Sequence, residues 1–192
     1  MRLHNADGAR KYLIAGERDA FLRKADLVDR AVKTLCMTSP MAGCRLSEAL
    51  ALTADRVGPG RRRAGVREPE EAPHRHLSQR ASAPALLDAL DMVHGIRERQ
   101  SRRGKRRGER LWPWSRMTGR HAVHGVMNAA GLDGPHASPK GLRHGFGVAA
   151  VAAGIPLNLV QKWLGHAQLT TTAIYANAVG AEEQDIARRM WG

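Results

Sequence analysis

The C-terminal part of the sequence contains three side chains that could bind a phosphate or react with it. These are Arg143, His166 and Tyr175. A guanidinium stays charged and can donate two parallel hydrogen bonds to phosphate oxygens. A phenol has an ordinary pKa of about 10, which neighbouring cations lower. If these side chains face one site, that site can bind an oxyanion beside a phenol that loses its proton more readily.

Two helices are expected to position the arginine and the histidine. The first is predicted over residues 139–153, because Ser138 and Pro139 are typical of an N-cap and a first helical position and a glycine follows. The second, over residues 156–164, begins at a proline and is ended by Gly165. The arginine therefore lies on the first helix, and the histidine directly follows the second.

A third helix is predicted to carry Tyr175. Thr170 can cap its N-terminus, after a short connection from the second helix. Because the connections between these helices are only a few residues long, the helices must pack on one another. Arg143, His166 and Tyr175 are therefore expected to face one small site.

The composition favours a nucleic acid as the partner. The 192 residues include 31 Lys+Arg against 18 Asp+Glu, which gives a formal charge of +13. Such a balance favours a polyanion, most commonly duplex nucleic acid. On charge alone, a basic protein without a specific partner is the alternative. Only 4% of the residues are aromatic, which argues against single-strand binding by base stacking.

Several other classes of site are disfavoured by the sequence. Cys36 and Cys44 are too few for a zinc site, and without a secretory signal they are expected to be reduced thiols in a cytoplasm. His121, His124 and His136 fit no usual zinc spacing. No apolar run approaches the roughly 20 residues that a membrane span needs. We therefore expect neither a metal site nor a membrane partner.

Two motifs resemble those of the tyrosine recombinases, the phage-integrase family. Residues 142–144 (Leu-Arg-His), residues 164–166 (Leu-Gly-His) and a threonine-rich run into Tyr175 resemble the C-terminal box of that family. Residues 42–48 (Ala-Gly-Cys-Arg-Leu-Ser-Glu) resemble its first arginine box. Two boxes in this order and at this spacing form a specific signal.

The resemblance covers roughly residues 38–57 and 84–192 and implies a mainly α-helical catalytic domain, a helical bundle with a small β-hairpin or sheet. The implied activity is that of a site-specific DNA recombinase or integrase of a mobile element, which cuts and rejoins duplex DNA through a 3′-phosphotyrosine. The ester conserves the energy of the broken bond, so the resemblance implies no cofactor and no metal. The implied partners are duplex DNA and further copies of the chain in a tetramer on DNA, in the nucleoid of a bacterial cytoplasm.

The same resemblance implies roles for five residues. Tyr175 is the implied nucleophile, and Arg45 and Arg143 bind the scissile phosphate. His166 hydrogen-bonds a non-bridging phosphate oxygen or the nucleophile. Lys140 stands where the family usually has a histidine. It keeps a cationic donor but lacks the neutral form that could accept a proton at pH 7.

A basic run is the candidate contact with the DNA backbone. It lies in a predicted loop over residues 100–110. Such a run is often only a solvated stretch, but beside a DNA site it is also placed to reach phosphates. Its members are Arg102, Arg103, Lys105, Arg106 and Arg107.

Residues 58–83 depart from the family pattern. They show neither strand nor helix periodicity, and prolines interrupt them. The family places here a hairpin whose lysine acts as general acid, but this segment holds no lysine. Loss of a general acid can slow such a step roughly 10²–10⁴-fold. We interpret the segment as a disordered linker, a degraded hairpin or the product of a compensated frameshift, because a one-nucleotide shift over residues 68–74 can restore Ser-Leu-Lys-Lys-Arg-Arg.

The other parts of the chain are expected to surround this site. Residues 1–17 are expected to form a loose arm, and residues 18–192 a catalytic domain without a separate core-binding domain. Apolar spacing predicts a first helix over residues 18–35, ended by a break at residues 37–40. Further helices are predicted over residues 46–52, 84–99, 118–130 and 181–191.

Two other functions stay open at this point. A helix, Gly154 and a second helix resemble a helix-turn-helix, so a non-catalytic DNA-binding protein is one alternative. An inactive recombinase remnant is the other, and the aberrant segment over residues 58–83 favours it. A type IB topoisomerase shares the chemistry, but the spacing from Leu-Gly-His to the tyrosine is closer to the integrases. Substituting Tyr175 by phenylalanine separates these functions, because a plain DNA-binding protein has no use for the phenol.

Overall fold

The structure, a computed structural model, describes residues 3–58, 83–101, 108–176 and 188. In these ranges the chain is built from α-helices and one 3-10 turn, and no β-strand is longer than an isolated bridge. The α-helices are α1 (Ala15–Ala25), α2 (Arg30–Ala42), α3 (Leu46–Leu50), α4 (Pro84–His94), α5 (Ile96–Ser101), α6 (Arg116–Ala129), α7 (Pro139–Ala152), α8 (Leu157–Leu164) and α9 (Thr170–Ala173), and the 3-10 turn is η1 (Ala54–Arg56). The expected mainly helical fold is confirmed.

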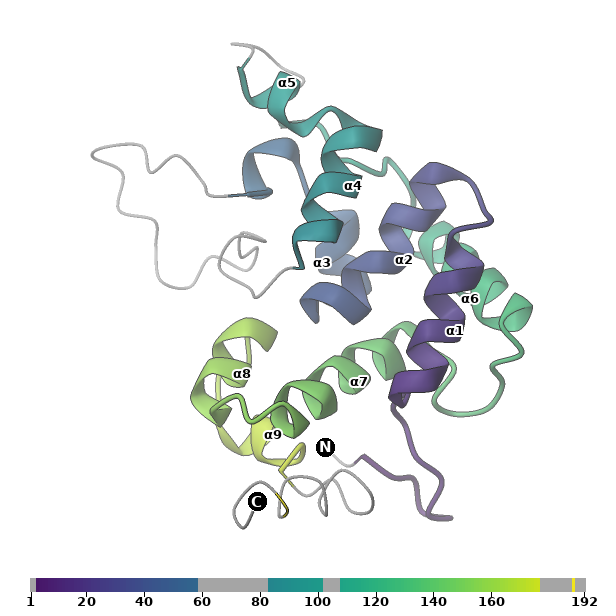
Figure 1. The fold of residues 1–192 in the computed structure, drawn as a ribbon, viewed down its shortest axis with the longest axis vertical. Helices are drawn as coiled ribbons and strands as arrows, with labels where there is room; N and C mark the ends of the chain where they lie inside the picture. Colours follow the sequence, from purple (N-terminus) through teal and green to yellow (C-terminus); the bar gives the residue numbers. More distant parts are fainter. Residues whose placement is uncertain (1–2, 59–82, 102–107, 177–187, 189–192) are drawn as a thin grey trace.

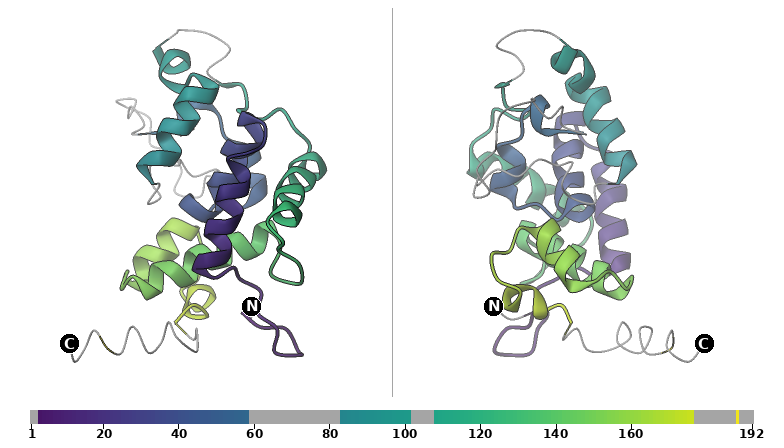
Figure 2. Two further views of the ribbon diagram at one scale, coloured as in Figure 1. Left: turned by 45° about the vertical axis from the view of Figure 1, so that its right-hand side comes forward. Right: turned by 90° about the vertical axis from the view of Figure 1, so that its left-hand side faces the viewer.

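Helix α2 lies at the centre of this arrangement. It packs against α1, α4, α6 and α7. Helices α4 and α5 lie at one end of the molecule, and α7, α8 and α9 lie at the other (Figures 1 and 2). The two stretches that carry the recombinase-like motifs, around α3 and from α7 to α9, are therefore brought together by α2.

Buried apolar side chains form two clusters, and α7 takes part in both. The larger cluster includes Trp112 and, from α7, Leu142. The smaller cluster includes Val148 of α7, Val160 of α8 and Tyr175. The arginine of α7 lies next to Leu142, where this helix passes from one cluster to the other.

The single helix predicted over residues 18–35 is two helices. Asp29 breaks it by capping α2, since its carboxylate accepts from the amides of Ala31 and Val32 in the first turn of the new helix, at 2.8 and 3.4 Å. The break expected at residues 37–40 is also wrong, because α2 continues through Pro40. That proline removes one backbone hydrogen bond near the end of the helix, and the burial of this half of α2 outweighs the loss. Gly43 ends α2 with a φ of 62°.

The loose arm expected over residues 1–17 is packed where the structure describes it. Leu3, Tyr12 and Leu13 are each no more than 5% exposed. The amide of Leu13 donates to the carbonyl of Gly141 on α7 at 3.3 Å. These apolar side chains come from a non-helical segment that packs beside α7. Because they are not spaced at regular intervals, the sequence pattern does not predict their burial.

Two further predictions concern helix boundaries. The helix expected over residues 84–99 is divided into α4 and α5 by Gly95, whose φ of 60° ends α4. The helix expected over residues 118–130 is confirmed as α6, which begins two residues earlier. Ser115 caps it by accepting from the amide of Thr118 at 3.0 Å.

Some expectations fall outside the described residues. They concern nearly all of the aberrant segment 58–83 with its hairpin, the basic run within 102–107, and the helix over residues 181–191 apart from Arg188. Among the described residues, no helix is both long and apolar enough to cross a membrane.

Candidate active site

Local signals at the ends of α7 and α8 set the frame of the site. Ser138 caps α7 by accepting from the amide of Gly141 at 3.0 Å, and Pro139 is the first helical residue. Gly165, with a φ of 68°, ends α8. Both helices lie where they are predicted, except that Pro156 is the N-cap residue of α8 and not its first helical residue. Arg143 consequently lies just beyond the first turn of α7, on a helix that starts at a defined residue.

Arg143 is buried and joins the ends of two other helices. It is 5% exposed. Its Nη1 donates to the carbonyl of Gly43 at the end of α2, and its Nη2 donates to the carbonyl of Leu164 at the end of α8, both at 2.7 Å. Helix C-termini carry partial negative charge and unpaired carbonyls, so they suit a buried cation. The guanidinium thus fixes the relative positions of α2, α7 and α8.

Arg45 lies at the surface of the same site. It is the N-cap residue of α3, at the edge where the sequence places it. Its Nη1 pairs with Oε1 of Glu48 at 2.6 Å, while Oε2 of Glu48 accepts from the Arg45 amide at 3.0 Å. The second carboxylate oxygen also lies 3.9 Å from Nη1 of Arg143. Glu48 therefore holds the two arginines, one exposed and one buried, beside each other.

Tyr175 and His166 pack ring against ring. Their centroids are 6.3 Å apart and their planes differ by 11°. Nδ1 of His166 is 2.9 Å from the hydroxyl oxygen of Thr172, in α9. The expectation that α9 carries the tyrosine is wrong, because the helix ends two residues before it, and Leu169 rather than Thr170 is the N-cap residue. A tight turn after this short helix points the phenol ring back at the histidine.

The electrostatic environment keeps both rings neutral. Burial raises the pKa of Tyr175 to about 12 and outweighs the lowering effect of Arg143 and Arg45. Burial, followed by the charges of the same two arginines, lowers the pKa of His166 to about 4, against the raising effect of Glu48. Glu48 joins Arg45 to Arg143. Arg143 in turn donates to the carbonyl of Leu164, at the end of the helix that His166 follows, and the His166 ring stacks on Tyr175. These contacts place the two arginines, the histidine and the tyrosine in one region of the fold.

His144 is a site residue to which the sequence analysis assigned no role. It is completely buried, and its Nδ1 lies 2.9 Å from the hydroxyl oxygen of Tyr175. Burial first, then Lys140 and Arg143, lowers its pKa to about 4. Its position beside Arg143 in the Leu-Arg-His motif was the available signal. A histidine on an otherwise apolar helix does not reveal its partner until the helices are packed.

Lys140 lies at the margin of the site. It is exposed on the first turn of α7, and it acts electrostatically on His144. The candidate DNA-backbone residues of the basic run lie outside the described residues. Of the three histidines considered as metal ligands, His136 instead pairs with Glu17, with Nε2 at 3.3 Å from Oε1. Within the described ranges, no group of three or more His, Cys, Asp or Glu side chains could hold a metal ion.

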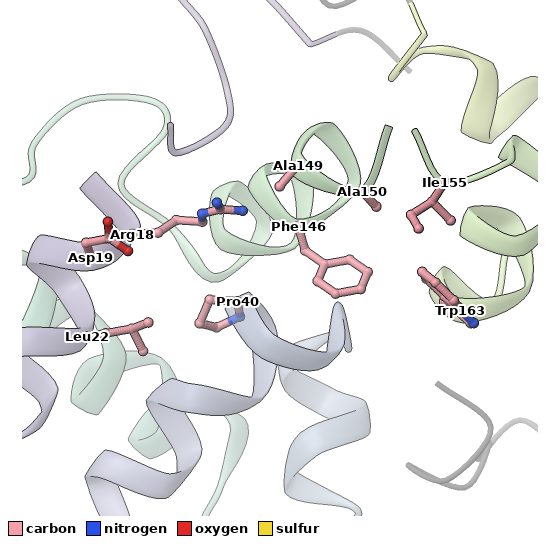
Figure 3. A pocket seen from close by; sticks show the side chains of 9 residues that line it. All are labelled: Arg18, Asp19, Leu22, Pro40, Phe146, Ala149, Ala150, Ile155 and Trp163. Carbon is pink, nitrogen blue, oxygen red and sulfur yellow. The ribbon is translucent and has the colours of Figure 1, made fainter. Parts of the chain in front are cut away.

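A groove of about 440 Å³ lies elsewhere on the surface, among α1, α2, α7 and α8 (Figure 3). Arg18 and Asp19 lie on the α1 side, Phe146 points into the middle, and Trp163 lies on the α8 side. The groove is mainly apolar and is lined by none of the candidate site residues. Its chemistry does not match a phosphate, so the cluster around Tyr175 is the better candidate active site.

A helical bundle that gathers two arginines, a histidine and a tyrosine at the junction of its helices has the architecture of a tyrosine-recombinase catalytic domain. Residues 18–181 match the phage integrase family. The chain belongs to this family.

Individual relatives agree with this assignment. The chain is 29% identical over 191 residues to a protein named resolvase from Escherichia coli, a match that covers 86% of this chain and 72% of the relative. It is 29% identical over 176 residues to tyrosine recombinase XerD of Corynebacterium glutamicum, covering 86% of this chain and 52% of the relative.

Solved structures show the same fold. The XerA recombinase superposes with a TM-score of 0.69 at 18% identity, over 93% of this chain and 62% of the XerA chain. The XerH site-specific recombinase, in a post-cleavage complex with its difH substrate, superposes with a TM-score of 0.66 at 20% identity, over 94% and 53% of the two chains. This chain thus spans little more than half of the solved recombinases that it resembles.

Proposed function

We propose that the protein is a site-specific DNA recombinase that cuts and rejoins duplex DNA through a covalent bond to Tyr175. The observation that supports this proposal is the series of contacts that links two arginines, a histidine and a phenol in a chain of the phage integrase family. The exposed Arg45 and the buried Arg143 give this site a positive potential.

The proposed reaction is a transesterification in two steps. The hydroxyl oxygen of Tyr175 attacks a DNA phosphorus, the bond from phosphorus to the 5′-oxygen breaks, and the phenol proton is lost while the 5′-oxygen gains one. The 5′-hydroxyl of a partner strand then attacks the phosphotyrosine, and the phenol leaves with a proton. The number of ester bonds is unchanged, so the exchange needs no external energy source.

The arginines stabilise the charge that develops on the phosphate. Each hydrogen bond from a charged donor contributes on the order of 1.5–3 kcal/mol. Arg45 is exposed enough to meet a phosphate directly, and Arg143 adds a buried positive charge behind it. His166 can donate to a non-bridging oxygen or to the nucleophile, and Lys140 supplies a further cation at the margin of the site.

The partners in this proposal are duplex DNA and further copies of the chain. The solved XerH structures contain difH DNA, and a Tn1549 transposon integrase of the same fold was solved with transposon end DNA. We propose further that the chain acts on a mobile element in the nucleoid, as a tetramer on DNA. Residues 18–192 form its catalytic domain, and the basic run near residue 105 reaches the DNA backbone.

Covalent capture tests this proposal. Purified protein is incubated with nicked duplexes that tile the DNA flanking its own gene, denatured, and separated on a gel. We expect a slower band that disappears in Tyr175→Phe and persists in Tyr12→Phe, the matched variant of the other tyrosine in the chain.

One outcome would contradict the proposal and has two explanations. Salt-sensitive DNA binding without a covalent band indicates an inactive remnant or a non-catalytic DNA-binding protein. Repeating the assay with the alternative reading frame restored over residues 58–83 separates those two, because only a remnant regains the band.

A further inference from the structure

The proposed nucleophile is enclosed by the protein. The side chain of Tyr175 is 0% exposed. A reacting oxygen must approach a phosphorus to roughly 3–3.5 Å, and a phosphodiester cannot come that close to a completely buried hydroxyl. The tyrosine must therefore leave its present position before it can react.

Two residues on one face of α7 hold the ring in this position. His144 and Gly147 are three residues apart, so they project from the same side of the helix. Nδ1 of His144 is 2.9 Å from the hydroxyl oxygen of Tyr175. A Cβ at Gly147 would come within 2.6 Å of the phenol Cζ, so the ring lies directly on the helix backbone. His166 covers the ring in a stacked contact.

The hydrogen-bond inventory indicates which group donates. Among the described residues, Nε2 of His144 is buried without a hydrogen-bond partner. If the phenol of Tyr175 donates to Nδ1, the imidazole carries its proton on Nε2, and only this N–H is left unpaired. If Nδ1 donates instead, the phenol O–H and the lone pair on Nε2 are both left unpaired. The first arrangement leaves fewer buried polar groups unsatisfied, so the phenol is the donor.

We propose that His144 is a positioning residue that accepts this hydrogen bond and holds Tyr175 in a closed resting position, which the tyrosine must leave before it can reach a phosphate. The inference rests on the proposed function only in calling Tyr175 the nucleophile; the closed position itself is a property of the free protein.

The expected effect follows from the strength of the contact. The net free energy of a typical neutral hydrogen bond shifts the equilibrium between the closed and open positions of Tyr175 roughly 2- to 12-fold. Removing the acceptor should therefore increase the fraction of molecules with an exposed Tyr175 by this factor. A buried side chain reacts with a reagent only during such openings, so its modification rate reports this fraction.

The experiment uses acetylation of phenols by N-acetylimidazole at neutral pH, with each tyrosine quantified by mass spectrometry of its peptide. The full chain contains only Tyr12 and Tyr175. Tyr12 is 4% exposed and lies outside the proposed contact, so it serves as an internal reference for the integrity of the fold. His144→Leu and His144→Phe remove the acceptor with two different shapes. His144→Asn keeps an acceptor near the position of Nδ1.

We expect acetylation of Tyr175 to rise roughly 2- to 12-fold in the Leu and Phe variants, to stay near the wild-type rate in His144→Asn, and to stay constant at Tyr12 in all variants. An unchanged Tyr175 rate in a folded Leu or Phe variant overturns the proposal. A parallel rise at both tyrosines in both of these variants also overturns it, in favour of a purely structural histidine. Since the assay needs neither DNA nor cleavage, its failure is distinguishable from failure of covalent capture.

Discussion

Replacing Arg143 by methionine tests whether this arginine holds the helices together as well as binding phosphate. The guanidinium donates to the carbonyls of Gly43 and Leu164 at 2.7 Å, and it is 5% exposed. Methionine is unbranched and apolar like the aliphatic part of arginine, but it lacks the guanidinium and donates no hydrogen bond. The substitution would leave two buried carbonyls at the ends of α2 and α8 without this donor.

The magnitude follows from these two contacts. Hydrogen bonds from a charged donor contribute about 1.5–3 kcal/mol each. Loss of both contacts therefore costs about 3–6 kcal/mol, and we expect Arg143→Met to lower the free energy of unfolding by this amount. Arg143→Lys keeps the charge, but an ammonium group can donate to only one of the two carbonyls with good geometry. We therefore expect about half of this decrease in the free energy of unfolding. Domains have a total stability of about 5–15 kcal/mol, so the effect is large enough to measure.

Urea unfolding followed by tryptophan fluorescence measures this loss. Arg45→Met is the matched control, because this arginine is exposed and its pair with Glu48 is of the kind that contributes about 0–1 kcal/mol. Both variants should abolish covalent capture, but only Arg143→Met should lose substantial stability. Equal and small losses in the two variants would refute the reasoning, since the carbonyls would then not depend on the guanidinium.

Three further predictions concern the rings around the phenol. Gly147→Ala should displace Tyr175, because the added Cβ would lie 2.6 Å from its Cζ, and should raise its acetylation rate at neutral pH. The raised pKa of Tyr175 means that stability is fully present below about pH 10 and is lost as the pH rises toward about 12; alkaline unfolding of Tyr175→Phe should lack this loss. The lowered pKa values of His144 and His166 mean that stability is fully present above about pH 6.5 and is lost as the pH falls toward about 4. Unfolding curves of His144→Asn should show a weaker acid dependence, and an unchanged dependence would contradict the assigned cause.

Much of the local structure could be predicted from the sequence. Ser138 with Pro139, and Gly165, set the ends of α7 and α8, because caps and glycine turns act over a few residues. The spacing of the motifs also identified the family. The predictions failed at α1 and α2, where the aspartate cap divides one apolar period and the proline is tolerated near the end of a buried helix.

The partners of the site residues were decided only by the tertiary structure. Arg143 bonds to a backbone carbonyl 100 residues away, and every residue has a carbonyl, so no residue type marks the partner. The contact of His144 with Tyr175, and the complete burial of that phenol, likewise depend on how α7 packs against the turn after α9. The sequence by itself determined the family, the helices near the site and the identity of the proposed nucleophile. Only long-range packing, in which contacts between distant segments add up, decided that the proposed nucleophile rests enclosed against α7.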